Sequence, residues 1–194
     1  METVFGLDID GVIRNICDIS LDLYNKVFKD NVKFEEWKEY DVDRQFPRIR
    51  EERGVSAATW FFDTHGTKLF HGGSEIGDPA ELVDRLREFG KVIIISYQKS
   101  KQNKIDTIQW LYDHDINYDG ICFVKDKSLV HVDYLIDDNP HYLVNSDCDH
   151  AILIDAPYNR NTVFAGKGSG RTYDRFGSLE EFVKHFEKEN EKKE

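Results

Sequence analysis

The stretch VFGLDIDGV, residues 4–12, joins a short apolar run to two aspartates and a glycine. The apolar run predicts a buried strand, and it places Asp8 and Asp10 at the carboxyl end of that strand, where open α/β sheets bind ligands. If the strand geometry continues through Asp10, both carboxylates lie on the same side of the chain. Gly11 then allows the backbone to turn away directly afterwards. This stretch therefore predicts a site at the edge of a buried sheet.

Short apolar runs alternate with amphipathic segments along the rest of the chain, which is typical of a parallel sheet covered by helices on both faces. The expected strands are VFGL (4–7), VIII (92–95), ICFV (121–124), YLI (134–136) and AILI (151–154). Helices are expected at 79–89, at 103–113 and from Ser178 onward. The helix 103–113 has an apolar face made of Ile105, Ile108, Leu111 and Tyr112, the kind of face that packs against a sheet. The predicted fold class is therefore α/β, with a Rossmann-like parallel sheet.

Residues 15–77 interrupt this alternation. One helix is expected at about residues 19–28, and the sequence after it is polar and rich in aromatic residues, without strand periodicity. We therefore expect a small helical cap, residues 15–77, inserted after the first strand. Residues 1–14 and 78–194 would form the core.

A second pair of carboxylates, Asp137 and Asp138, follows the expected strand YLI. A solvated turn at the end of a strand could explain either acidic pair alone. Packed into one cleft without a cation, however, the four aspartates would repel one another strongly, whereas Mg²⁺ prefers such oxygen ligands. The two pairs together therefore predict a magnesium site.

Between the acidic pairs lie candidate groups for binding a phosphate. Ser96 follows the strand VIII, and its hydroxyl group and the next backbone N–H could hold a phosphate oxygen. Lys104 is near the start of the next helix, where a cation is disfavoured by the helix dipole unless an anion is nearby. Lys127, in a later loop, is a competing cation. Either lysine could instead be a solvated surface group.

The overall composition restricts the partners of the chain. A formal net charge of −11 disfavours binding to a polynucleotide backbone or to an anionic membrane, because both would repel this surface. No stretch is apolar and long enough to span a bilayer, and the first residues do not resemble a signal peptide. The three cysteines have no CxxC spacing and predict neither a disulfide framework nor a zinc site, which fits a cytoplasmic location. A monomer or homodimer acting on a small phosphorylated metabolite is expected.

Taken together, these motifs resemble those of the haloacid dehalogenase superfamily of phosphotransferases. DIDGV matches the first motif, Ser96 the second, Lys104 or Lys127 the third, and Asp137-Asp138 the fourth. The resemblance spans roughly residues 4–140. The stretches LDIDGV, YLIDDNP and LIDAPYNR are similar to the 5′(3′)-deoxyribonucleotidase branch, which carries a small helical cap between the first two motifs.

The resemblance implies that Asp8 is the nucleophile and Asp10 the general acid and base. It implies Mg²⁺ as the cofactor, held by Asp8, the Asp10 carbonyl group and the pair Asp137-Asp138. Lys104 is preferred to Lys127 because the branch carries its lysine near the start of the helix after the second motif. The chain departs from the branch at Ser96-Tyr97-Gln98, where Thr-Ser-Pro is common, and at Ile16, where an aromatic residue is frequent.

The expected function is that of a magnesium-dependent phosphomonoester hydrolase acting on a nucleoside monophosphate through an aspartyl phosphate. The chemistry agrees, because a phosphate dianion repels a carboxylate nucleophile until cations neutralise its oxygens. The candidate substrate contacts are Tyr97, Lys127 and two cap rings, Trp37 and Trp60, either of which could instead belong to the cap core. Arg14 is expected at the surface, and the loop 155–160 could orient the substrate or cap the sheet edge.

Three alternatives remain open from the sequence. The substrate could be another small phosphate ester. The chain could be a catalytically silent binding protein, although both aspartates of DIDG are intact. It could also be a receiver-like domain that accepts phosphate, although the long insertion after the first motif argues against this.

Overall fold

The computed structural model of the protein describes residues 2–162 and 172–192. Parallel strands form a six-stranded sheet in the order β5-β4-β1-β6-β7-β8. The strands are β1 (Thr3–Leu7), β4 (Gly90–Ser96), β5 (Gly120–Phe123), β6 (Val132–Asp137), β7 (Cys148–Ile154) and β8 (Thr172–Phe176). Every strand predicted from an apolar run is present, and the predicted α/β fold class is confirmed.

The sheet has a reversal of chain order at its centre. From β1 the sheet grows through β4 and β5 on one side and through β6, β7 and β8 on the other. Such a reversal leaves a crevice at the carboxyl ends of the two strands that flank it, here β1 and β6. The sequence does not predict β8, since it is the last strand at one edge and most of its residues are polar and exposed.

Helices cover both faces of the sheet, as predicted. The helices of the core are α5 (Pro79–Arg87), α6 (Lys101–Asp113), α7 (Pro140–Asn145) and α8 (Leu179–Glu191). Side chains of α5, α6 and α8 join strand residues such as Ile94 in one hydrophobic cluster. Leu143 of α7 joins the neighbouring residue Ile95 in another cluster. Successive side chains of a strand point to opposite faces, so both faces are buried. No helix in the described ranges is long and apolar enough to cross a membrane.

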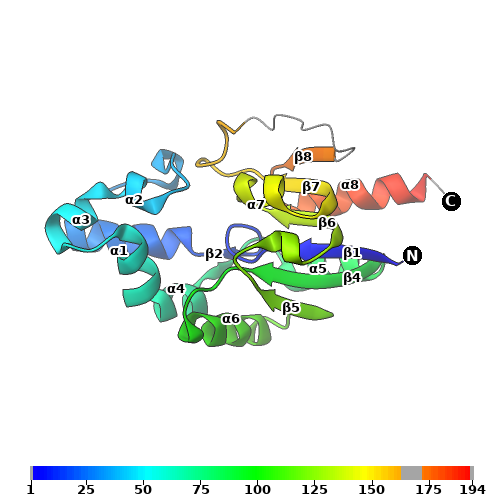
Figure 1. The fold of residues 1–194 in the computed structure, drawn as a ribbon, viewed down its shortest axis with the longest axis horizontal. Helices are drawn as coiled ribbons and strands as arrows, with labels where there is room; N and C mark the ends of the chain where they lie inside the picture. The colour runs from blue at the N-terminus through cyan, green and yellow to red at the C-terminus, as the bar shows by residue number, and fades with distance from the viewer. Residues whose placement is uncertain (1, 163–171, 193–194) are drawn as a thin grey trace.

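The segment between β2 (Arg14–Asn15) and β3 (Ser74–Glu75), residues 16–73, is called the insertion below. It contains α1 (Cys17–Phe28), η1 (Phe34–Glu36), α2 (Val42–Gln45), α3 (Pro47–Arg53), the π-helix η2 (Thr59–Thr64) and α4 (Gly66–Gly72). β2 and β3 pair antiparallel at its base. The insertion has a hydrophobic cluster of its own, rich in aromatic residues. It lies beyond the carboxyl ends of the strands (Figure 1), so it can cover a site there.

The orientation of α6 differs from the prediction. Ile105, Ile108 and Tyr112 are 59%, 45% and 78% exposed, and only Leu111 of the predicted apolar face is buried. The buried face carries instead Asn103, Asp106, Thr107, Trp110 and Leu111.

The packing of α6 against α4 explains this difference. The indole N–H of Trp110 donates to the carbonyl oxygen of Gly73 at 2.6 Å, and the amide of Asn103 donates to that of Phe62 at 3.0 Å. Asn103 and Trp110 on this face therefore find partners in the backbone of the insertion, which hydrophobic periodicity does not reveal.

Candidate active site

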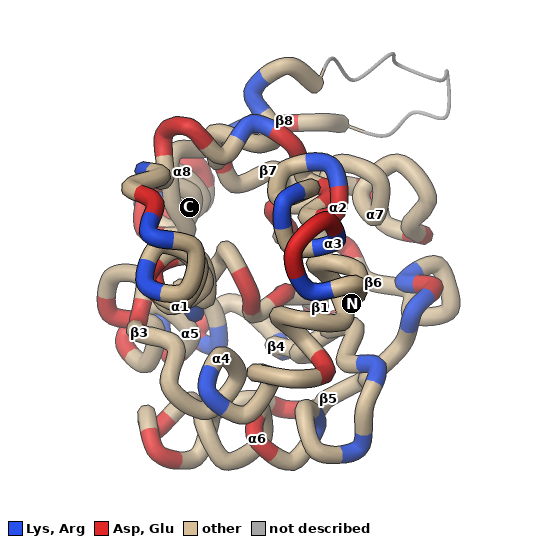
Figure 2. The backbone as a smooth tube through the Cα atoms, turned by 90° about the vertical axis from the view of Figure 1, so that its left-hand side faces the viewer, with Lys and Arg blue, Asp and Glu red and all other residues tan. Residues whose placement is uncertain are grey.

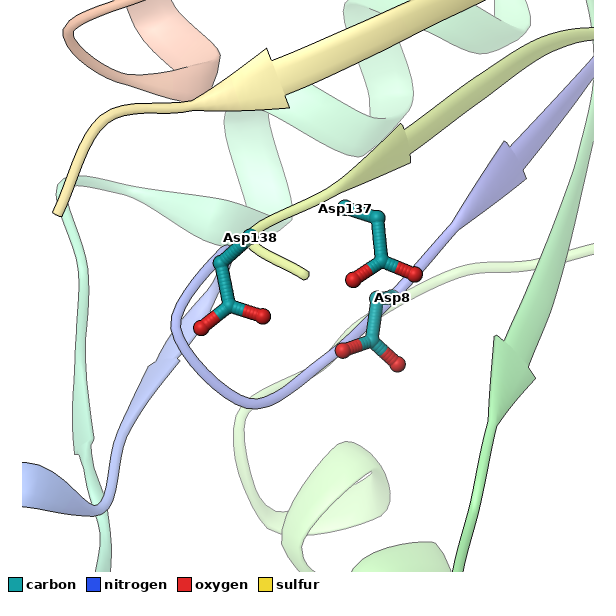
Figure 3. Close-up of side chains that lie close together, drawn as sticks. All are labelled: Asp8, Asp137 and Asp138. Carbon is teal, nitrogen blue, oxygen red and sulfur yellow. The ribbon is translucent and has the colours of Figure 1, made fainter. Parts of the chain in front are cut away.

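Three carboxylates meet at the point where β1 and β6 end. Leu7 lies beside Ile136 in the sheet, and the backbone N–H of Asp8 donates to the carbonyl oxygen of Ile136 at 3.0 Å. Asp8, Asp137 and Asp138 each offer a carboxylate oxygen, and these oxygens lie within 4.8 Å of one another. Figure 3 shows the three side chains turned toward a common point. We call these three residues the acidic cluster.

Lys127 supplies positive charge to this cluster. It lies in the short helix η3 (Lys127–Leu129), is 2% exposed, and places its Nζ 2.9 Å from Asp8 Oδ1 and 2.6 Å from Asp137 Oδ2. Burial acts to lower the pKa of this ammonium group, but the charges of Asp137 and Asp8 outweigh burial and raise the pKa. Lys127 is therefore charged beside the expected nucleophile.

The preference for Lys104 is not supported by this arrangement. Lys104 is half-buried on α6, and its Nζ lies over the ring of Phe123 at 5.8 Å. The resemblance to the deoxyribonucleotidase branch favours Lys104, at the start of the helix after the second motif, but the loop after β5 brings Lys127 to the acidic cluster instead. The physical reason is that β5 and β6 flank opposite sides of the β4-β1 pair, so the connection between them crosses the carboxyl ends of those strands.

The acidic cluster carries more negative than positive charge. Burial, together with repulsion from Asp137 and Asp10 and against the attraction of Lys127, raises the pKa of Asp8 to about 7. Burial and the charges of Asp137 and Asp8 also raise the pKa of Asp138 well above its usual range. Buried carboxylates with raised pKa values are short of cationic partners, and a divalent cation that prefers oxygen ligands would provide one. The donor set therefore fits a hard metal ion.

Asp138 is held by the loop that follows β7. The Tyr158 hydroxyl group donates to Asp138 Oδ2 at 2.5 Å, and the Asn159 amide donates to the backbone carbonyl oxygen of Asp138 at 2.8 Å. Gly11, with φ of +81°, approaches the same carboxylate so closely that a Cβ there would lie 2.2 Å from Oδ2. The sequence leaves the role of loop 155–160 open, and the structure shows that it braces the acidic cluster.

Asp10 has different surroundings. Its Oδ1 accepts from Arg14 Nε at 2.7 Å, and its Oδ2 accepts from Gln98 Nε2 at 2.9 Å. Gln98 also lies 3.5 Å from the hydroxyl group of Ser96, which is buried at the end of β4. The expectation of a surface position for Arg14 is wrong, because this residue is 0% exposed. Charge pairing with Asp10 explains its burial.

The two tryptophans expected to contact the substrate are parts of a packed cluster. Trp37 and Trp60 are 5% and 6% exposed and pack among the other aromatic residues of the insertion. Trp37 also packs near Tyr158, with 6.1 Å between ring centroids. Their indole faces are therefore used in the insertion itself, the alternative that the sequence leaves open.

Two partly exposed tyrosines, Tyr40 and Tyr97, belong to the segments around the site. Burial of its hydroxyl group, followed by the charges of Asp138 and Asp137, raises the pKa of Tyr40 well above its usual range, although 46% of the residue is exposed. Tyr40 packs against Tyr158, with 5.7 Å between ring centroids, and Tyr158 donates to Asp138, so Tyr40 is one ring away from the acidic cluster. Tyr97 directly follows Ser96 and is 39% exposed.

Sequence reasoning misses several of these groups. Gln98 carries a detectable signal, because it stands two residues after Ser96 and so projects on the same side as that hydroxyl group. Tyr158 and Asn159 lie in the stretch LIDAPYNR, which contributes to the resemblance to the deoxyribonucleotidase branch. Tyr40 is one of several cap aromatic residues that the sequence offers for stacking on a base, and only the packing of the insertion distinguishes it from the others.

Comparison with known proteins identifies relatives in sequence and in fold. Residues 2–168 match the model of the family described as 5′ nucleotidase, deoxy (pyrimidine), cytosolic type C protein. A 5′(3′)-deoxyribonucleotidase of Clostridium acetobutylicum is 26% identical over 163 residues, which cover 80% of this chain and 83% of that protein.

Solved structures of haloacid dehalogenase-like proteins share the fold. A hydrolase from Burkholderia xenovorans superposes with a TM-score of 0.61 at 10% identity, over 96% of this chain and 97% of its own. A hydrolase from Bacillus subtilis, solved with magnesium bound, has a TM-score of 0.55 at 14% identity, over 96% and 99% of the two chains. At these identities the likeness shows the fold, and the family match carries the information on activity.

Proposed function

Because the chain belongs to the 5′ nucleotidase, deoxy (pyrimidine), cytosolic type C family, we propose that it hydrolyses a deoxyribonucleoside monophosphate to the nucleoside and inorganic phosphate. The name of the Clostridium acetobutylicum relative supports this substrate class. The observation that carries the proposal is the meeting of Asp8, Lys127 and the pair Asp137-Asp138 at the reversal of chain order. A charged lysine and an excess of carboxylates beside a strand-end aspartate suit phosphoryl transfer to that aspartate.

In the first step, an oxygen of Asp8 attacks the phosphorus atom of the ester. A bond forms between that oxygen and phosphorus, and the bond from phosphorus to the nucleoside oxygen breaks. The leaving oxygen takes the electron pair and receives a proton from Asp10, which enters this step as the carboxylic acid and accepts from Arg14 and Gln98 with its remaining lone pairs. Lys127, 2.9 Å from Asp8 Oδ1, orients the nucleophile and reduces its repulsion from the phosphate oxygens.

In the second step, a water molecule attacks the phosphorus atom of the aspartyl phosphate. Asp10, now a carboxylate, takes a proton from that water. The bond between phosphorus and the Asp8 oxygen breaks, which releases phosphate and restores the Asp8 carboxylate. Asp10 thus donates a proton in one step and recovers one in the next, so no net change remains in the protein.

We propose Mg²⁺ as the cation that completes the acidic cluster. The carboxylates of Asp8, Asp137 and Asp138, with the backbone carbonyl group of Asp10, would hold it. When bound, it would supply positive charge that neutralises the phosphate oxygens. Magnesium bound in the Bacillus subtilis protein of the same fold supports this choice.

The base of the nucleotide is proposed to rest against the exposed rings of Tyr40 and Tyr97, in place of Trp37 and Trp60. Tyr40 is 46% exposed and packs against Tyr158, and Tyr97 is 39% exposed and directly follows Ser96, whereas the two tryptophans are buried. Stacking on a ring tolerates different bases, so we expect modest selectivity among them.

A small substrate fits the charge of the molecule better than a polynucleotide does. Figure 2 shows acidic and basic positions interspersed over the insertion, and the net charge is −11. A nucleic-acid backbone would be repelled by this surface. A cytoplasmic location is proposed from the scarcity and spacing of the cysteines.

The proposal is tested by a phosphate-release screen over deoxyribonucleoside and ribonucleoside monophosphates, sugar phosphates and p-nitrophenyl phosphate, each with and without Mg²⁺. The expected result is magnesium-dependent release with the highest kcat/KM on a deoxyribonucleoside monophosphate. A sugar phosphate as the best substrate would leave a phosphatase but refute the nucleotide assignment. Release from none of these esters would refute the function itself.

A further inference from the structure

Arg14 is a completely buried arginine, and each of its three guanidinium nitrogens donates a hydrogen bond. Its Nε donates to Asp10 Oδ1 at 2.7 Å, its Nη1 to the carbonyl oxygen of Phe70 at 2.5 Å, and its Nη2 to the hydroxyl group of Thr107 at 3.1 Å. Burial of a charge is costly unless it is paired and hydrogen-bonded. Here the paired group is the carboxylate to which the proposed function assigns proton transfer.

The surroundings of Arg14 restrict it to one orientation. The guanidinium carbon lies 5.3 Å from the ring centroids of both Phe70 and Trp110. A Cβ at residue 73 would lie 2.7 Å from Arg14 Cγ, so Gly73 leaves the room that the side chain needs. The contacts come from α4 and its C-terminal end in the insertion and from α6 in the core. The guanidinium group therefore connects Asp10 to both parts of the molecule.

The backbone between Asp10 and Arg14 forms a compact turn. The N–H of Arg14 donates to the carbonyl oxygen of Ile9, and the N–H of Gly11 donates to that of Arg14, both at 2.9 Å. This turn brings the arginine back onto the carboxylate four residues before it. With Arg14 on Oδ1 and Gln98 on Oδ2, two donors set the plane of the carboxyl group.

We propose that Arg14 is a positioning residue that holds the carboxyl group of Asp10 in line with the leaving oxygen and ties this orientation to α4 of the insertion. The inference rests on the proposed function, because it requires Asp10 to donate a proton to the leaving group. Arg14 itself touches no reacting atom. Its effect follows from geometry, since displacement of a catalytic group by about 1 Å can cost about 10²-fold in rate.

Two esters with different leaving groups test this role. An alkyl ester such as a deoxyribonucleoside monophosphate releases an alkoxide, which needs a proton as it departs, whereas p-nitrophenolate is stable as an anion and needs little help. The measured quantity is kcat/KM, which reports steps up to the release of the leaving group. Hydrolysis of the aspartyl phosphate, common to both esters, therefore does not obscure the comparison.

The variants are Arg14→Met and Arg14→Lys, with Arg85→Met as the matched control. Arg85 pairs with Glu187 between α5 and α8 and contacts none of the site residues. We expect Arg14→Met to lower kcat/KM on the nucleotide by about 10²-fold, with a loss on p-nitrophenyl phosphate at least about tenfold smaller. Arg14→Lys should recover part of the nucleotide activity, because an ammonium group can still reach Asp10. Arg85→Met should leave both values unchanged.

Loss of a buried arginine could prevent folding, so thermal unfolding is measured for each variant. If Arg14→Met does not fold, the Thr107→Val variant provides the test. It removes one hydrogen-bond acceptor of the Arg14 guanidinium group and keeps the charge of Arg14. We again expect kcat/KM to fall more on the nucleotide than on p-nitrophenyl phosphate. Equal losses on the two esters would overturn the positioning role and leave Arg14 as a structural residue. Wild-type protein that hydrolyses neither ester would instead overturn the proposed function, and the two failures are thereby distinguished.

Discussion

Asp8 and Asp10 stand two residues apart, yet the structure surrounds them differently. Asp8 shares a buried pocket with Asp137, Asp138 and one lysine, and burial raises its pKa to about 7. Asp10 is matched by the guanidinium group of Arg14 and the amide of Gln98. The first pocket has unbalanced negative charge and suits a cation with a nucleophile. The second is balanced and holds one carboxyl group in place, so the two aspartates of one DxD motif have the different electrostatic surroundings that the two proposed roles require.

Metal removal should produce the largest effect, because it leaves the carboxylates of Asp8, Asp137 and Asp138 without the cation that would offset their negative charge. We expect excess EDTA to abolish phosphate release and Mg²⁺ to restore it. Mg²⁺ should also raise the unfolding temperature of the wild-type protein, since a ligand of the folded state stabilises it. Undiminished turnover in excess EDTA would contradict the interpretation of the acidic cluster.

Replacement of the nucleophile comes next. Asp8→Asn should lower kcat by about 10⁴-fold or more, because an amide does not attack phosphorus. The change is nearly isosteric and removes one of several repelling carboxylates, so the unfolding temperature should not fall. A fluoroaluminate or beryllium fluoride adduct bonded to a residue other than Asp8 would refute the assignment.

The two lysines provide a matched comparison. Lys127→Met should lower kcat by about 10²- to 10³-fold, the size of loss expected when a preorganised charge is removed from a phosphoryl-transfer site. It should also destabilise the protein, because Asp8 and Asp137 lose their buried partner. Lys104→Met should change kcat little, since that side chain lies over Phe123. If Lys104→Met is the damaging change, the placement of the third motif at Lys127 is wrong.

Tyr158→Phe should have a moderate effect confined to metal binding. It removes the hydroxyl donor to Asp138 Oδ2 and keeps the ring that packs beside Trp37. Loss of such an outer contact typically weakens metal binding by about 10- to 100-fold. We expect a higher Mg²⁺ concentration for half-maximal activity with nearly unchanged kcat at saturation. Tyr112→Phe is the control, because Tyr112 is a 78% exposed tyrosine on α6. If both variants need the same Mg²⁺ concentration for half-maximal activity, Tyr158 does not support the metal site through Asp138.

The smallest effect should come from the substrate-facing rings. Tyr40→Ala and Tyr97→Ala should each lower kcat/KM for nucleotides by about tenfold, which corresponds to the lower part of the range of about 1–3 kcal/mol per stacked base. The p-nitrophenyl ester, which has no base, should be affected much less. Tyr112→Ala controls for loss of an exposed tyrosine elsewhere. Equal losses on nucleotide and p-nitrophenyl ester would show that these rings do not bind the base.

The central strands, the acidic pairs and the haloacid dehalogenase-like fold could all be predicted, because each depends on local pattern. A short apolar run followed by carboxylates identifies a buried strand and its functional end without knowledge of the rest of the chain. The predictions fail where a side chain can pack in more than one way. On α6 the apolar residues Ile105 and Ile108 are exposed, because the opposite face, with Trp110 and Asn103, finds hydrogen-bond partners on the insertion.

The sequence by itself determined that four aspartates follow two buried strands, and this pattern predicts oxygen ligands and a phosphate-directed site. Only the tertiary structure decided that Lys127 rather than Lys104 contacts Asp8 and that Arg14 is buried against Asp10. It also decided that Trp37 packs inside the hydrophobic cluster of the insertion. The physical reason is range. Strand ends are specified by neighbours a few residues away, whereas Lys127 and Trp37 find partners in distant segments of the chain. Arg14 is only four residues from Asp10, but its burial also depends on Phe70 and Thr107, which the docking of α4 on α6 brings together. Their energies depend on burial and charge pairing, which exist only once the chain is folded.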